Sequence, residues 1–264
     1  MQKILVIFCF VLIACNNQAN KELPNTNKYP APIPALLKAV TQWPDSFALR
    51  YELVNAFDSL DFPLDAAASI DSILSFPGQE KNYDLWLQKA QLAERGEDTM
   101  QAIRAYNQAI RIYPNPDALL YLANILAEKR DSNALKVCNN IYREGADKRQ
   151  LSFAVFIEGV YYARTLQHAK AIEKFDQSIQ QNYQLTEAYL EKAFILYEAK
   201  KYPEAIAVLD KANTVRSTVA DVWYWLGKCY EAMQIKEKAI EYYSKALALD
   251  AQLKEAKAAI ERLK

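Results

Sequence analysis

The sequence predicts an all-α fold, a solenoid of stacked helical hairpins. Ala, Leu, Lys, Glu and Gln, which favour helix, dominate long segments, and the chain contains only 5 glycines. Aromatic and small residues also recur with a period of about 34 residues, as from Tyr189 to Trp223. A fixed period of this length indicates repeated supersecondary units that stack on one another.

Residues 1–14 have the layout of a bacterial signal peptide. A basic start precedes an apolar run that begins at Ile4 and is about half the ~20 residues that a membrane-spanning helix needs. The run ends in LIAC, at Cys15, which resembles the lipobox of bacterial lipoproteins. That resemblance implies cleavage before Cys15 and a lipid, diacylglycerol and palmitate, on the chain. The alternative is an ordinary secretory signal with a chance cysteine.

Residues 15–32 are polar, contain Asn and Pro and lack apolar periodicity, which predicts a flexible tether after the lipidated cysteine. Asn16 follows Cys15. In enterobacterial lipoproteins an aspartate at this place retains the protein at the inner membrane. The resemblance therefore implies a lipid-anchored protein of the bacterial cell envelope at the outer membrane.

Six repeats are expected between residues 46 and 253. Their ranges are near 46–79, 83–116, 116–150, 152–185, 186–219 and 220–253. A half-repeat at 33–45 precedes them. An amphipathic helix at 254–264 is expected to cap the array, because a solenoid must cover its last apolar face.

Alternating small and large residues define each hairpin. Two helices approach closely only where small residues lie at their crossing, and large residues fill the space around that point. The residues that carry this pattern are Trp86, Ala90, Ala102, Tyr106, Ala109, Gly159, Ala171, Phe175, Ala193, Ala205, Ala212, Trp223, Gly227, Tyr230, Ala239 and Ala246. The pattern resembles the tetratricopeptide repeat. The resemblance implies a right-handed superhelix.

The same resemblance places the first helix of each repeat along a concave groove. The candidate partner-binding residues are Leu120, Tyr121, Asn124, Phe153, Phe156, Val160, Arg164, Leu190, Phe194, Tyr197, Tyr224, Trp225 and Lys228. Helix packing does not itself require apolar residues there, so this apolar stripe favours an interaction surface with aromatic anchors. The alternative is that neighbouring helices or the termini cover the stripe.

No catalytic, cofactor-binding or metal-ligating constellation stands out. The chain has one histidine, His168, which is expected to pack within a repeat, and no glycine remains for a phosphate-binding loop. Cys138 and Cys229 fall at apolar helical positions and are expected to be buried free thiols. With 32 basic and 32 acidic residues, a nucleic-acid partner is disfavoured. We expect no enzyme, no cofactor and no metal.

Two functions remain open from the sequence. The first is a membrane-anchored adaptor or scaffold whose groove binds a peptide or helix of another envelope protein. The second is a glycan- or cell-wall-binding lipoprotein, because aromatic faces such as those of Tyr197, Tyr224 and Trp225 stack on sugar rings.

Overall fold

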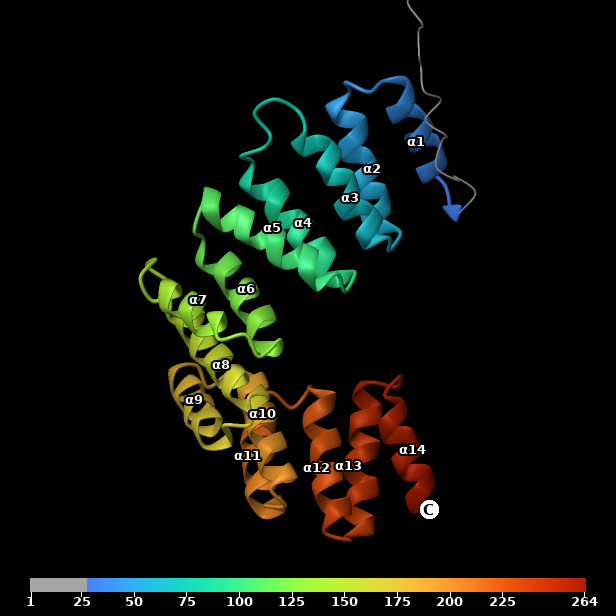
Figure 1. Ribbon diagram of the computed structural model, residues 1–264. Coiled ribbons are helices and arrows are strands. Elements are labelled where there is room, and N and C mark those ends of the chain that lie inside the picture. Colours follow the sequence, from blue (N-terminus) through green and yellow to red (C-terminus); the bar gives the residue numbers. More distant parts are fainter. Residues whose placement is uncertain (1–27) are drawn as a thin grey trace, which may run out of the picture.

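The structure is a computed structural model that describes residues 28–264. That range holds 14 α-helices and no strand, arranged as hairpins along an open arc (Figure 1), so the predicted all-α solenoid is confirmed. The helices are α1 (Ile33–Gln42), α2 (Phe47–Ser59), α3 (Pro63–Leu74), α4 (Tyr83–Arg95), α5 (Thr99–Ile112), α6 (Pro116–Glu128), α7 (Asn133–Ile141), α8 (Lys148–Arg164), α9 (His168–Gln181), α10 (Thr186–Glu198), α11 (Tyr202–Val215), α12 (Ala220–Ala232), α13 (Lys236–Leu249) and α14 (Lys254–Leu263).

In the hairpins α8–α9 and α12–α13, a glycine of the first helix faces an aromatic ring of the second. A Cβ added to Gly159 would lie 2.6 Å from Cε1 of Phe175, and one added to Gly227 would lie 2.6 Å from Cδ1 of Tyr243. The ring therefore occupies the space where a side chain would stand, and the two helices touch. All the alanines of the expected pattern are buried, whereas Trp86, Trp223 and Tyr230 are half-buried.

The turn inside each hairpin uses a residue with a left-handed backbone. This residue is Asp61, Glu97, Arg130, Leu166, Lys200 or Gln234, with φ between 60° and 63°. In the α4–α5 turn, the main-chain N–H of Asp98 donates to the carbonyl of Ala93, which satisfies a free carbonyl at the end of α4. The repeated turn geometry keeps successive hairpins similar in shape.

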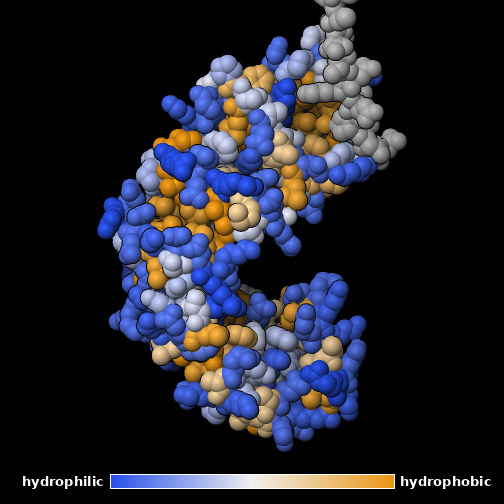
Figure 2. Space-filling view, in the orientation of Figure 1, coloured by the Kyte–Doolittle hydropathy of each residue, from blue (hydrophilic) through white to orange (hydrophobic). Residues whose placement is uncertain are grey.

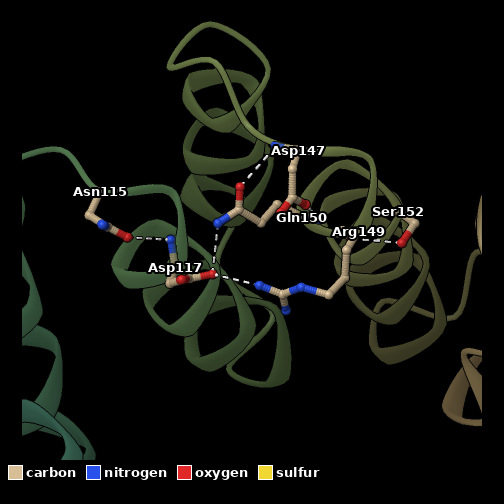
Figure 3. A network of polar contacts seen from close by, with 6 residues as sticks. All are labelled: Asn115, Asp117, Asp147, Arg149, Gln150 and Ser152. Carbon is tan, nitrogen blue, oxygen red and sulfur yellow. Dashed lines mark hydrogen bonds and ion pairs between the residues drawn. The ribbon is translucent and has the colours of Figure 1, made fainter.

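Helix α8 is longer than the other first helices and begins at Lys148, inside the range expected for the preceding repeat. A capping box starts it, in which Asp147 and Gln150 each accept a hydrogen bond from the other's main-chain N–H. Gln150 also donates to Oδ1 of Asp117 on α6, 2.9 Å away (Figure 3). The additional turn thus links the starts of α6 and α8.

Both ends of the described chain pack on the array. Tyr29 lies edge-on to Phe57 and Phe62, with ring centroids 5.1 and 5.2 Å away, and its hydroxyl donates to Asp65. The last residues of the expected tether, 28–32, therefore lie against α2 and α3, while residues 15–27 and the expected signal peptide lie outside the described residues. At the other end, α14 buries Ala256 and Ala259 against α13.

Three other features complete the fold. His168 is exposed, so the predicted packing of this side chain is wrong: it starts α9 at the hairpin turn, beyond the contact with α8. Cys138 and Cys229 are buried free thiols. Within residues 28–264 no helix combines the length and the apolar character needed to cross a bilayer.

Candidate functional site

The first helices α6, α8 and α10 lie on the inner side of the arc, and their partners α7, α9 and α11 lie outside (Figure 1). The space-filling view shows this inner side as an open hollow with both hydrophobic and hydrophilic surface beside it (Figure 2). Two pockets open along it, and most of the residues that line them belong to the predicted groove. We call this concave surface the groove.

The first pocket lies between α6 and α8 and has a volume of about 320 Å³. Apolar and aromatic side chains form most of it, and Asp117 and Arg149 form its polar end, joined by an ion pair of 3.3 Å. The residues that line it are Asp117, Leu120, Tyr121, Asn124, Arg149, Phe153, Phe156 and Ile157. A pocket of this composition suits an apolar side chain with a polar neighbour.

The second pocket lies where α8, α10 and α12 meet and has a volume of about 450 Å³. It is lined by Arg164, Leu190, Glu191, Phe194 and Trp225. Phe194 is 39% exposed, although a side chain of its size and apolarity is usually buried. This pocket therefore places an exposed apolar side chain next to the charged Arg164 and Glu191.

Trp225 is the centre of an aromatic cluster. Its ring centroid lies 5.3 Å from that of Phe194, 5.4 Å from that of Tyr197 and 5.9 Å from that of Tyr224, each edge-to-face. Lys228 places its ammonium 5.5 Å from the Tyr197 ring. Because edge-to-face contacts fix ring orientation, α10 and α12 present a preorganised aromatic surface.

Arg164 joins three helices across the groove. Its guanidinium donates two hydrogen bonds to Glu128 of α6, at 2.8 and 3.0 Å, and two to Glu191 of α10, at 2.9 and 2.8 Å. These two carboxylates raise the pKa of Arg164 above its usual value. Two carboxylates around one cation leave the cluster with one net negative charge. Arg164 therefore links α6, α8 and α10 and is not available as a free cation.

Buried tyrosines support the groove from behind. The hydroxyls of Tyr106 and Tyr243 donate to Glu94 and Glu231, at 2.7 and 2.6 Å, across equivalent hairpins. Burial and these carboxylates raise the pKa of both phenols. Each tyrosine therefore stays protonated and fixes a glutamate near the end of the first helix of its hairpin.

The structure separates some of the predicted groove residues from the rest. Val160 is only 1% exposed, because it lies on the side of α8 that packs in the hydrophobic core. Its assignment to the groove is therefore wrong. Leu120 is nearly buried but reaches the first pocket. Tyr121, Asn124, Phe153 and Phe156 gather at the first pocket. Leu190, Phe194 and Trp225 gather at the second, beside Tyr197, Tyr224 and Lys228.

Sequence reasoning missed Glu191, Asp117, Arg149 and Ile157, which also line the pockets. Glu191 carried a signal, since it lies one helical turn before Phe194 and so shares its face. Arg149 carried none, because it lies in the segment that the repeat period treats as a connection. Within residues 28–264, no group of three or more His, Cys, Asp or Glu side chains is placed to hold a metal ion.

Similarity to known proteins agrees with the repeat. The chain is 29% identical to the photosystem I assembly protein Ycf3 of Acaryochloris marina over 111 residues, which are 40% of this chain and 66% of that protein. A tetratricopeptide repeat protein from Parabacteroides merdae superposes with a TM-score of 0.67 at 19% identity, over 88% of this chain and 90% of that one. PilW, a type IV pilus biogenesis factor, superposes with a TM-score of 0.63 at 18% identity, over 81% and 98%. At these identities the two structures show the fold alone.

Family models described as tetratricopeptide repeat match residues 87–148, 158–217 and 220–253. Together these ranges cover more than half of the chain. They include every residue that lines the second pocket and the α6 residues of the first, whereas residues 149–157 of α8 fall between two of the ranges. The chain therefore belongs to the tetratricopeptide repeat family.

Proposed function

We propose that this protein is a lipid-anchored adaptor whose groove binds a segment of another cell-envelope protein. Membership of the tetratricopeptide repeat family favours an adaptor or scaffold that acts through protein–protein interaction. The observation that carries the proposal is the exposed Phe194 beside Trp225 on the concave side. An aromatic anchor next to a pocket is the usual centre of a protein interface.

The described ends of the chain do not cover this surface. Helix α14 packs on α13, and Tyr29 packs between α2 and α3, at opposite ends of the array (Figure 1). The alternative that these parts of the termini occupy the apolar stripe is therefore not supported. A segment of another protein is the occupant that we propose.

Capture of partners from cells tests the groove. Phe194→Glu/Tyr224→Glu places two charges on the aromatic surface and is expected to abolish crosslinking to the partner. Met100→Glu/Leu249→Glu is the matched control, since it adds the same charge at exposed apolar side chains of second helices. The proposal fails if no envelope protein is captured, or if both double variants capture it equally well.

The anchor rests on the LIAC sequence that ends at Cys15. We propose cleavage before this residue and acylation of the new N-terminus, which would hold the array at the outer membrane. Several acyl chains give stable anchoring, since each buried methylene contributes about 0.8 kcal/mol. Metabolic labelling with palmitate is expected to mark the native protein and not Cys15→Ser, which should also leave the membrane fraction. A labelled Cys15→Ser variant would contradict the anchor.

A glycan is the second candidate ligand. The observation that favours it is the combination of aromatic rings with hydrogen-bonding Arg164 and Glu191 in one pocket. Isothermal titration with peptidoglycan fragments and common oligosaccharides tests this reading, and Trp225→Ala is the variant expected to lose binding. Absence of heat across the panel would remove it.

A further inference from the structure

The face of α10 that carries Phe194 is acidic. Glu187, Glu191 and Glu198 occur with Phe194 at successive spacings of three or four residues, so all four side chains lie on one side of the helix. Glu187 and Glu198 are exposed, and neither forms an ion pair within residues 28–264. Two carboxylates are therefore available on either side of Phe194, an exposed aromatic side chain of the groove.

Three cations near this face already have partners. Arg164 binds Glu128 and Glu191 through four hydrogen bonds. Lys192 of α10 turns away from the groove and pairs with Asp176 of α9 at 2.5 Å. Lys228 lies over the Tyr197 ring. An anionic partner would thus meet cations that have partners, together with carboxylates that repel it.

The two helices that hold the aromatic cluster, α10 and α12, carry a net negative charge. Helices α10 and α12 contain five acidic residues, Glu187, Glu191, Glu198, Asp221 and Glu231, and two basic ones, Lys192 and Lys228. Complementary charge across an interface speeds encounter and selects among partners of similar shape. The aromatic end of the groove is therefore biased toward cations.

We propose that the groove selects a basic amphipathic segment of its partner protein. An apolar side chain of that segment enters the pocket beside Phe194 and Trp225. Lys or Arg side chains on the neighbouring turns pair with Glu187 and Glu198. This proposal rests on the proposed function and adds the chemistry of the ligand to it. It also disfavours recognition of a free C-terminal carboxylate.

The probes are two synthetic amphipathic helices of equal length with the same leucine stripe, one with lysine and one with glutamate on the polar face. Fluorescence anisotropy measures their binding to the full chain. The lysine peptide is expected to bind, more weakly as salt rises, and the glutamate peptide is not. Glu187→Gln/Glu198→Gln is expected to weaken binding of the lysine peptide about two- to thirtyfold, the range for two exposed ion pairs.

Two control variants separate selection from general attraction. Glu173→Gln/Asp210→Asn removes the same charge from exposed positions of α9 and α11 and is expected to leave binding unchanged. Phe194→Ala is expected to abolish binding of the lysine peptide without altering charge. Equal weakening by both charge variants would overturn the proposal, because attraction would then be non-specific.

The remaining outcomes distinguish this proposal from the adaptor itself. Equal or stronger binding of the glutamate peptide overturns the selection of basic segments. Failure of both peptides, together with capture of a cellular partner that depends on Phe194 but not on Glu187 and Glu198, also overturns it and leaves the adaptor standing. If neither peptide binding nor capture of a cellular partner depends on Phe194, the adaptor is contradicted as well.

Discussion

The ring nitrogen of Trp223 donates a hydrogen bond to the main-chain oxygen of Ser217, 2.8 Å away. Trp86 makes the same bond, at 2.9 Å, to the residue six positions before it, and the hydroxyl of Tyr189 does so at 3.1 Å. One repeat position therefore fastens the connection between hairpins in three places. The aromatic residues that mark the sequence period fill space and also fix the angle at which each hairpin follows the last.

Replacing Trp223 with Phe tests this role. The ring stays apolar and large, but the donor to Ser217 is lost, so the free energy of unfolding should fall by about 1 kcal/mol. Trp86→Phe should give a similar loss. Urea denaturation followed by circular dichroism measures both. An unchanged midpoint for both variants would mean that water replaces the bond without loss.

Much of the fold follows from the period, because contacts within a hairpin depend on spacing alone. Gly159 and Phe175 stand 16 positions apart in the sequence, as do Gly227 and Tyr243, and the structure places both pairs in contact. The aromatic stripe was predictable for the same reason. A helix-turn-helix unit of fixed length brings the same repeat positions together each time.

The charged part of the groove could not be derived in this way. Arg164 lies 36 residues after Glu128 and 27 before Glu191, so neither contact keeps the period. Both depend on the rotation between successive hairpins, which the capping box at Asp147 and the additional turn of α8 change. Val160, which the period assigns to the groove, also lies in the core. Contacts of this kind depend on the connections, which carry no periodic signal.

Gly159→Ala should destabilise the fold through overpacking. The added methyl meets the Phe175 ring, and such crowding costs about 1–3 kcal/mol, offset in part by about 1 kcal/mol of better helix propensity. Phe175→Leu should rescue it, because Ala193 and Leu209 occupy the same two positions in the next repeat. A double-mutant cycle in urea measures the coupling. Additive losses would show that the ring and the glycine do not constrain each other.

Leu166→Gly should stabilise the protein. Leu166 has φ of 62° and is 72% exposed, so it bears the strain of a left-handed backbone while burying little surface. Relief of about 1–2 kcal/mol of backbone strain outweighs the stability that is lost because glycine raises the entropy of the unfolded chain. The melting temperature should rise, whereas Thr165→Gly, at an ordinary φ beside it, should lower it. If the melting temperature falls with both variants, the left-handed backbone at Leu166 is not strained.

The two thiols of the array should be unreactive in the folded protein. Burial raises the pKa of Cys138 and of Cys229 to about 12, so little thiolate exists at about pH 8. In a Cys9→Ser/Cys15→Ser variant, Ellman's reagent should detect almost no thiol under native conditions and both thiols in denaturant. Rapid native labelling of either would show that its helix opens readily.

Glu231 should make stability depend on pH. Burial raises the pKa of this carboxyl, but hydrogen bonds from Tyr243 at 2.6 Å and Arg262 at 2.5 Å outweigh burial and hold it below the usual 4.5. A carboxyl whose pKa is lowered by folding stabilises the fold above that usual value and loses this contribution as pH falls through its folded pKa. Glu231→Gln should therefore cost about 1 kcal/mol at pH 7 and much less at pH 3.

Urea titrations of native and variant protein at both pH values measure this convergence. Glu237→Gln is the control, because Glu237 is an exposed carboxylate at the start of the adjoining helix α13 and forms no ion pair within residues 28–264. Its effect should be small and should change little between pH 7 and pH 3 in comparison. A loss for Glu231→Gln that stays constant with pH would mean that shape, and not charge, holds Tyr243 and Arg262 around this carboxyl.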